Sequence, residues 1–73
     1  MAPAADPRRR RPTDGQIRII ECLSHGLGYK GTAEVLVLSP YTVKGQVRDA
    51  KRRAAAKDQA HLIGICLREG WIQ

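Results

Sequence analysis

The segment spanning residues 39–54 constrains the fold of this chain more than any other. Ser39 is a helix-capping residue, and Pro40 follows at the first helical position, where the missing N–H of proline costs nothing. The apolar residues after it are spaced by four, three and four positions, which places them on one side of a helix: Val43, Val47, Ala50 and Ala54. We therefore predict a helix over residues 40–54 with one apolar face.

Two shorter helices are expected before it. Thr13 and Gln16 fit a capping box, so a first helix begins there and ends near His25, before the glycines at 26 and 28. Its apolar stripe is Ile17, Ile19, Ile20 and Leu23. A second helix over about residues 30–37 would bury Ala33, Leu36 and Thr32.

A fourth helix is expected from the capping residue Asp58 to about residue 69, with Gly70 in the position of a C-terminal glycine. A helical wheel groups its apolar residues Leu62, Ile63, Cys66 and Leu67. Ile65 points away from this group, toward His61, and so needs a partner. We expect Ile65, His61 and an exposed Trp71 to form a surface for a homodimer.

Composition supports an all-α fold for this chain of 73 residues. It has no Phe and no long alternating β-branched run, so its apolar material lies at helical spacing. Residues 1–12 contain three of the four prolines and an arginine run, so they can neither hold a helix nor bury apolar surface. The prediction is a flexible basic arm over residues 1–12 and one four-helix domain over residues 13–73.

The two cysteines and the hydropathy pattern bear on location. Cys22 and Cys66 lie in apolar helical segments, and neither has another Cys or His at a metal-ligand spacing. We interpret both as reduced packing residues, with a disulfide between them as the open alternative, and we expect no metal or cofactor. No hydrophobic stretch reaches the ~18 residues that span a bilayer, and the N-terminus lacks a secretion signal. A cytoplasmic protein is expected.

The net charge of +6 is concentrated in two places. The first is the arm, where four arginines stand against one aspartate. The second is the range 44–57, with six cationic residues against one aspartate. The rest of the chain is mildly acidic. Such a division is typical of a surface that binds a polyanion, since a generally basic protein spreads its charge more evenly.

Helices two and three together have the organisation of a helix-turn-helix. DNA reading by such a motif requires a helix that fits the major groove, cations near phosphates, and long donors that reach base edges from its N-terminal half. The helix over residues 40–54 meets each requirement. The alternative is a solvated basic helix in a small bundle.

One run of residues, in register with its neighbours, carries a family resemblance. The run is Ser39-Pro40-Tyr41-Thr42-Val43-Lys44, with Gly26 upstream and Ala33 and Leu36 between them. It resembles the opening of the recognition helix in the LuxR/GerE-type helix-turn-helix DNA-binding domain, and the match extends from about residue 12 to residue 72. The resemblance implies a tetrahelical domain whose third helix reads the major groove and whose fourth offers a dimer surface.

The resemblance also implies roles for individual residues. Lys44 and Arg48 would contact base edges, guanine above all, and Gly45 would allow close approach of the backbone to a base. Phosphate contacts would come from Tyr41, Thr42, Lys51, Arg52 and Lys57. Apart from the resemblance, we hypothesise that the arm residues Arg8, Arg9, Arg10 and Arg11 reach an adjacent minor groove or the phosphates, with a disordered tail as the alternative.

Four positions depart from the family's pattern. Gly45 stands where a base-contacting side chain is common, and Gln46 where His is common. Ala55 replaces a usual glycine after the third helix, and Thr32 replaces a usual Ile in the second. These departures indicate a divergent member. Family members usually carry a receiver or small-molecule-binding domain before this module, and here only an arginine-rich arm precedes it, so we expect a stand-alone member of prokaryotic or phage origin.

The expected function is sequence-specific regulation of transcription by a homodimer on double-stranded DNA, with RNA polymerase or another regulator as further candidate partners. An enzyme is not expected, because His25 and His61 are far apart in sequence and no phosphate-cradling glycine motif precedes a helix. The alternative is a small protein-interaction module, an anti-activator or co-regulator, that uses its fourth helix.

Overall fold

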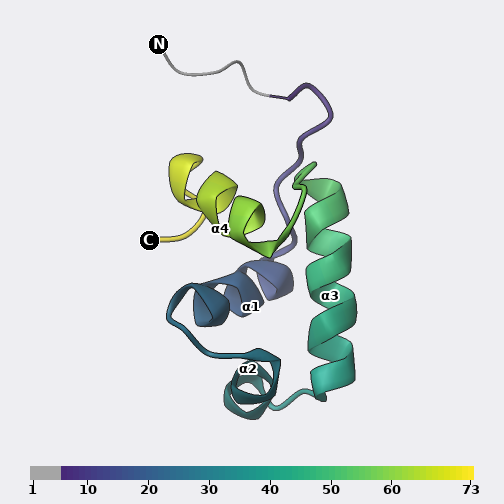
Figure 1. Ribbon diagram of the computed structural model, residues 1–73, viewed down its shortest axis with the longest axis vertical. Coiled ribbons are helices and arrows are strands. Elements are labelled where there is room, and N and C mark those ends of the chain that lie inside the picture. Colours follow the sequence, from purple (N-terminus) through teal and green to yellow (C-terminus); the bar gives the residue numbers. More distant parts are fainter. Residues whose placement is uncertain (1–5) are drawn as a thin grey trace.

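The computed structural model describes residues 6–73, which form four helices without any strand (Figure 1). They are α1 (Asp14–Ser24), α2 (Tyr29–Leu36), α3 (Pro40–Arg53) and α4 (Gln59–Arg68). The predicted all-α fold with four helices is thus confirmed, and each helix begins or ends within one or two residues of its predicted bound. Residues 1–5 of the predicted arm lie outside the described range.

Three of the four helices begin at the side-chain caps that the sequence indicates. The Thr13 hydroxyl accepts the Gln16 N–H at 3.2 Å, and the Gln16 side-chain oxygen accepts the Thr13 N–H at 3.0 Å, which is a complete capping box. Ser39 Oγ accepts the Thr42 N–H at 3.0 Å at the start of α3. Asp58 caps α4 in the same way, 2.8 Å from the His61 nitrogen. These short-range bonds fix where the helices start.

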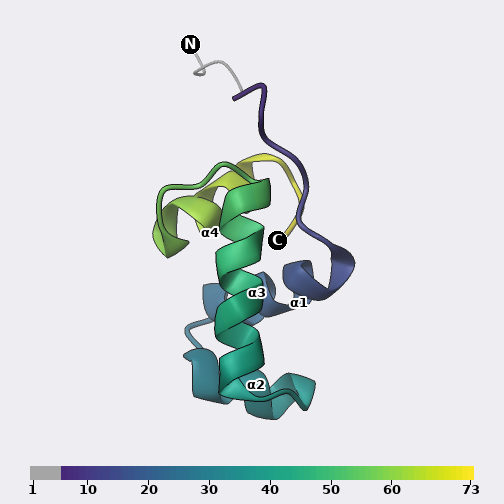
Figure 2. The ribbon, with the colours of Figure 1, turned by 90° about the vertical axis from the view of Figure 1, so that its right-hand side faces the viewer.

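The core lies on one side of α3. Its predicted stripe is confirmed, because all four residues are at most 1% exposed: Val43, Val47, Ala50 and Ala54. This stripe packs in one cluster with the isoleucines of α1 and with Ala33 of α2. Figures 1 and 2 show α1, α2 and α4 all to the same side of α3. The long helix therefore has an opposite side that no other element covers.

The apolar side of α4 differs from the prediction. Leu62, Ile65 and Cys66 are buried, whereas Leu67 is 50% exposed. On the helix, Ile65 and Ile63 lie on opposite sides of Leu62, so a small rotation of α4 decides which of the two isoleucines faces the core with Leu62. In the structure it is Ile65, which is 1% exposed. The prediction that Ile65 lies on an outer dimer surface was therefore wrong. Trp71 is also not exposed as expected, since it is partly buried against the core.

The segment before α1 also corrects a prediction. The Arg10 N–H donates to the Arg53 carbonyl at 2.7 Å, and Arg9 Nε donates to the Ala54 carbonyl at 2.8 Å. Residues 9–12 are therefore docked on the C-terminal end of α3 and are not part of a flexible arm. The physical reason is that the last carbonyls of a helix have no partner within it, and the arginine segment supplies donors to them.

Two connections use left-handed backbone conformations at residues other than glycine. Val37 ends α2 with φ 57°, and Ala55 follows α3 with φ 53°. Both turns are short, and they set the directions in which α3 enters and leaves the bundle.

Both cysteines are free thiols, as the sequence analysis expects, with Cys66 buried and Cys22 half-buried. Burial raises the pKa of the Cys66 thiol. Across residues 6–73, no helix combines the length and the apolar character needed to cross a membrane.

Candidate nucleic-acid interface

The uncovered side of α3 carries a row of cationic and aromatic residues. Its members are Tyr41, Lys44, Gly45, Arg48, Lys51 and Arg52. They recur at intervals of three and four, opposite the buried stripe, so they share one face of the helix. Tyr41 is 87% exposed, although an aromatic ring of this size usually finds cover in a folded protein. We call this row the α3 face.

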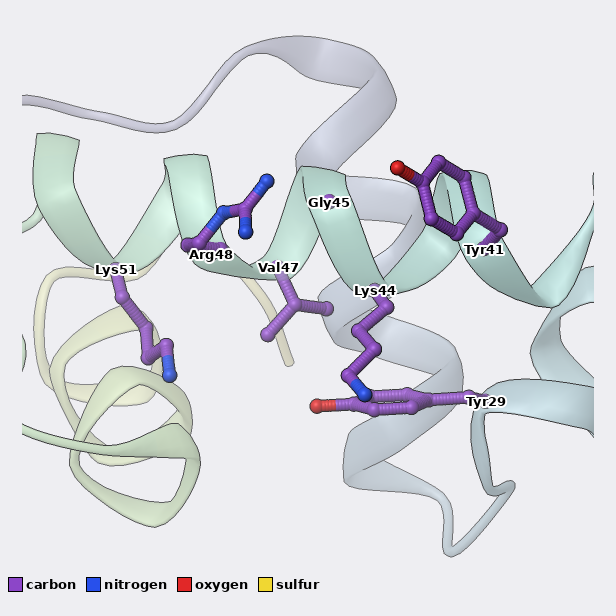
Figure 3. A pocket seen from close by; sticks show the side chains of 7 residues that line it. All are labelled: Tyr29, Tyr41, Lys44, Gly45, Val47, Arg48 and Lys51. Atoms are coloured by element: carbon purple, nitrogen blue, oxygen red, sulfur yellow. The ribbon is translucent and has the colours of Figure 1, made fainter.

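A shallow cleft of about 350 Å³ runs along the α3 face and is walled on one side by Tyr29, the first residue of α2. Figure 3 shows the Lys44 side chain extending from α3 toward the side of the cleft on which Tyr29 lies. Arg48 extends in another direction, over α3. The side chains of the two residues predicted to contact bases thus point in different directions from the same exposed face of α3.

The sequence analysis missed Tyr29. It begins a short helix, and nothing in its local spacing distinguishes it from a solvated residue. Its role as a wall of the cleft comes from the way α2 crosses the start of α3.

Gly45 opens a gap at the centre of the α3 face. A Cβ built on Gly45 meets no atom within 4 Å, so packing within the domain does not require glycine there. The empty space faces outward between Tyr41 and Arg48. A bound molecule could therefore approach the α3 backbone more closely at Gly45 than at Tyr41 or Arg48.

A hydrogen-bond network limits the α3 face on the side of α1. Gln16 is 2% exposed, and its amide nitrogen donates to Gln46 Oε1 at 2.9 Å and to Asp49 Oδ2 at 2.7 Å. The single carboxylate of α3 is thereby hydrogen-bonded to α1 through one of its two oxygens. Gln46, which stands where the resembled family has His, is occupied by the same network. This network also fixes the rotation of α3 about its axis.

The N-terminal end of α3 presents a hydroxyl donor. Ser39 Oγ donates to Thr42 Oγ1 at 2.9 Å, so the Thr42 hydroxyl proton stays free to donate outward from an exposed position. Arg18 of α1 lines the same shallow groove as Thr42 and Gln46. The sequence analysis did not single out Arg18, because it belongs to a part of the chain with a slightly negative balance.

The remaining predicted phosphate contacts gather at the other end of α3. Lys51, Arg52 and Lys57 line one cleft together with Arg8 and Arg9 of the N-terminal segment, by which we mean residues 6–12. Arg52 is 4.0 Å from Asp49, a weak exposed ion pair.

Two arginines of the N-terminal segment are paired with carboxylates. Arg8 is paired with Asp6 at 2.8 Å, and its hydrogen bonds hold the pKa of the Asp6 carboxyl well below its usual range. Arg11 is paired with Asp14 at 2.8 Å. Of the four arginines expected to reach DNA, Arg10 alone keeps its side chain out of the ion pairs and side-chain hydrogen bonds seen within residues 6–73.

The three residues predicted as a dimer surface do not form one apolar patch. His61 is half-buried, and its Nδ1 accepts the Lys57 N–H at 2.9 Å. Ile65 lies in the interior and Trp71 is half-buried. The exposed large apolar residue of α4 is Leu67 instead.

No protein-family model matches this sequence, and a search of curated proteins finds no match either. The features that bear on function are therefore those of the structure itself. They are a four-helix domain, a long helix with one buried and one uncovered face, and cations along and beyond the uncovered face.

Proposed function

We propose that this protein is a sequence-specific, double-stranded DNA-binding regulator of transcription, with α3 as its recognition helix. The observation that carries the proposal is the division of α3 into two faces. One face is fully buried, and the opposite face carries four cations and a highly exposed tyrosine, while the only carboxylate of the helix is hydrogen-bonded toward α1. The resemblance to the LuxR/GerE-type domain supports the same orientation.

The chemistry of the α3 face suits the major groove. The groove admits one α-helix, and each guanine presents two acceptors there that match long cationic donors. Lys44 and Arg48 are proposed to make these base contacts. Because Gly45 has no side chain, the backbone of α3 can lie deeper in the groove at this position.

Phosphate contacts would hold the helix in place along both strands. Thr42 has a free hydroxyl proton near the start of α3, with Tyr41 beside it. Lys51 and Arg52 lie toward its end. Such contacts fix position and orientation and carry no sequence information directly.

A second copy would strengthen binding. A single module of this size buries only about 600–1,000 Å² on DNA, so two copies on two half-sites are proposed to act together. Because Ile65 is internal, the proposed α4 contact between copies would involve Leu67 and the partly buried Ile63.

The proposal is tested by selecting duplexes from a random DNA library with the full chain and with a variant carrying Lys44→Ala and Arg48→Ala. The full chain should enrich a defined sequence. Each lost base contact should cost about 1–3 kcal/mol of discrimination, so the variant should lose the preference. Circular dichroism should be unchanged, since both side chains are exposed.

A matched control removes the same charge elsewhere, with Lys30→Ala and Arg68→Ala on α2 and α4. This control should keep the selected sequence, even if its overall affinity falls. The proposal fails if the full chain enriches no sequence, which would favour a protein-interaction module. It also fails if the Lys44 and Arg48 variant enriches the same sequence as the parent.

A further inference from the structure

A cationic cleft lies where the N-terminal segment meets the end of α3. It has a volume of about 500 Å³. Its charged lining consists of five cations and one carboxylate: Arg8, Arg9, Lys51, Arg52, Lys57 and Asp6. The lining comes from three parts of the chain, namely residues 6–9, residues 51–57 and His61 of α4. The cleft therefore exists only because the N-terminal segment is docked.

The docked segment changes the electrostatics of this helix end. Unpaired carbonyls at the C-terminus of a helix carry partial negative charge and repel anions. Here Arg9 Nε donates to the Ala54 carbonyl at 2.8 Å and the Arg10 N–H donates to the Arg53 carbonyl at 2.7 Å. The carbonyls that would oppose an anion are thus already bound to donors.

Two ammonium groups in the cleft are left without a carboxylate partner. Neither Lys51 nor Lys57 forms an ion pair within the described part of the chain. The Asp6 carboxylate is occupied by Arg8, accepting its backbone N–H at 2.9 Å, its Nε at 3.1 Å and a terminal nitrogen at 2.8 Å. Asp6 therefore positions Arg8 and does not neutralise the lysines.

The cleft is continuous with the α3 face. Lys51 lines both this cleft and the shallow cleft beside Tyr29. Figure 1 shows the N-terminal segment running alongside the upper, C-terminal end of α3. When a helix lies in the major groove, side chains toward its ends face the phosphates that border the groove.

We propose that the docked N-terminal segment completes a phosphate-binding cleft, and that this cleft takes a backbone phosphate of the DNA whose major groove α3 occupies. The inference rests on the proposed function and adds a contact outside the recognition helix. The docked segment takes the place of the flexible arm that the sequence predicts. Arg9 is held on α3 and Arg8 on Asp6, so the segment acts as a fixed clamp at the edge of the groove.

The test compares salt dependence of binding on one short duplex of mixed sequence. The full chain is compared with a double variant, Arg8→Gln with Lys57→Gln. Both side chains are exposed, and the bond from the Lys57 backbone N–H to His61 does not involve the substituted atoms. Losing one phosphate contact should reduce the slope of log affinity against log salt by about 0.9.

The control carries Lys30→Gln with Arg68→Gln and removes the same charge away from the cleft. Its slope should equal that of the parent. Equal slopes for the parent and the cleft variant would overturn the clamp while leaving the α3 contacts standing. A parent that fails to bind duplex DNA would instead overturn the proposed function, and the clamp with it.

A second measurement separates DNA phosphate from a free phosphate ligand. The parent and the cleft variant are titrated with inorganic pyrophosphate, followed by amide chemical shifts of residues 51–57. If saturable pyrophosphate binding requires Arg8 and Lys57 while the DNA salt slope does not, the cleft serves a free phosphate and the proposal is wrong. A reduced slope on DNA, with only weak shifts from pyrophosphate, supports the clamp.

Discussion

Val37 offers a test of how strain is distributed in the turn before the recognition helix. It ends α2 in the left-handed conformation, with φ 57° and ψ 51°, where a Cβ crowds the following carbonyl and a β-branched residue is an outlier. Its side chain is 88% exposed, so replacing it removes little packing. The substitution Val37→Gly therefore removes strain at almost no cost in contacts.

The magnitude follows from two opposing effects. The left-handed conformation costs an L-residue about 1–2 kcal/mol, which glycine avoids. Glycine in turn gives the unfolded chain more freedom, which opposes folding by about 0.5–1 kcal/mol. The expected net stabilisation is about 0.5–1 kcal/mol. For a domain of this size, that raises Tm by about 2–8 °C.

Urea and thermal unfolding, followed by circular dichroism, measure this effect. Val35→Gly is the matched control, because Val35 is a largely exposed valine inside the same helix, at 60% exposure. Glycine there should destabilise the domain by about 0.5 kcal/mol. Replacing valine by glycine should thus stabilise the domain at position 37 and destabilise it at position 35. A loss of stability in Val37→Gly would refute the argument that strain resides in this turn.

Two further predictions concern buried groups. Thr32 is fully buried, and its hydroxyl has no hydrogen-bond partner among the described residues. Thr32→Val should therefore stabilise the domain by about 1–2 kcal/mol, measured by urea unfolding. No gain in stability would mean that the hydroxyl has a partner in solution, for example a buried water. Burial raises the pKa of Cys66 above its ordinary value of 9.0, so the folded thiol keeps its proton where the unfolded thiol ionises, and stability should fall as pH rises through that value. Cys66→Ala should remove this part of the pH dependence, and in the parent Cys66 should alkylate more slowly than Cys22; equal rates for the two thiols would contradict the assigned burial.

The sequence alone determined the starts of α1, α3 and α4 and the two faces of α3. The capping bonds at Thr13, Ser39 and Asp58 each join atoms three residues apart, so their signals are contained in the local sequence. The stripe from Val43 to Ala54 needs only the period of the helix. For the same reason, the exposure of Lys44 and Arg48 opposite that stripe could be predicted.

Only the tertiary structure decided which residues meet across long stretches of chain. Local periodicity allowed Ile65 or Ile63 to face the core beside Leu62, and the packing of α4 chose Ile65. Tyr29 became a wall of the α3 face because of the angle at which α2 crosses it. The prolines and the arginine run of the N-terminal segment predicted a flexible arm that neither holds a helix nor buries apolar surface. The segment is ordered instead by the unpaired carbonyls at the end of α3, more than 40 residues away in sequence.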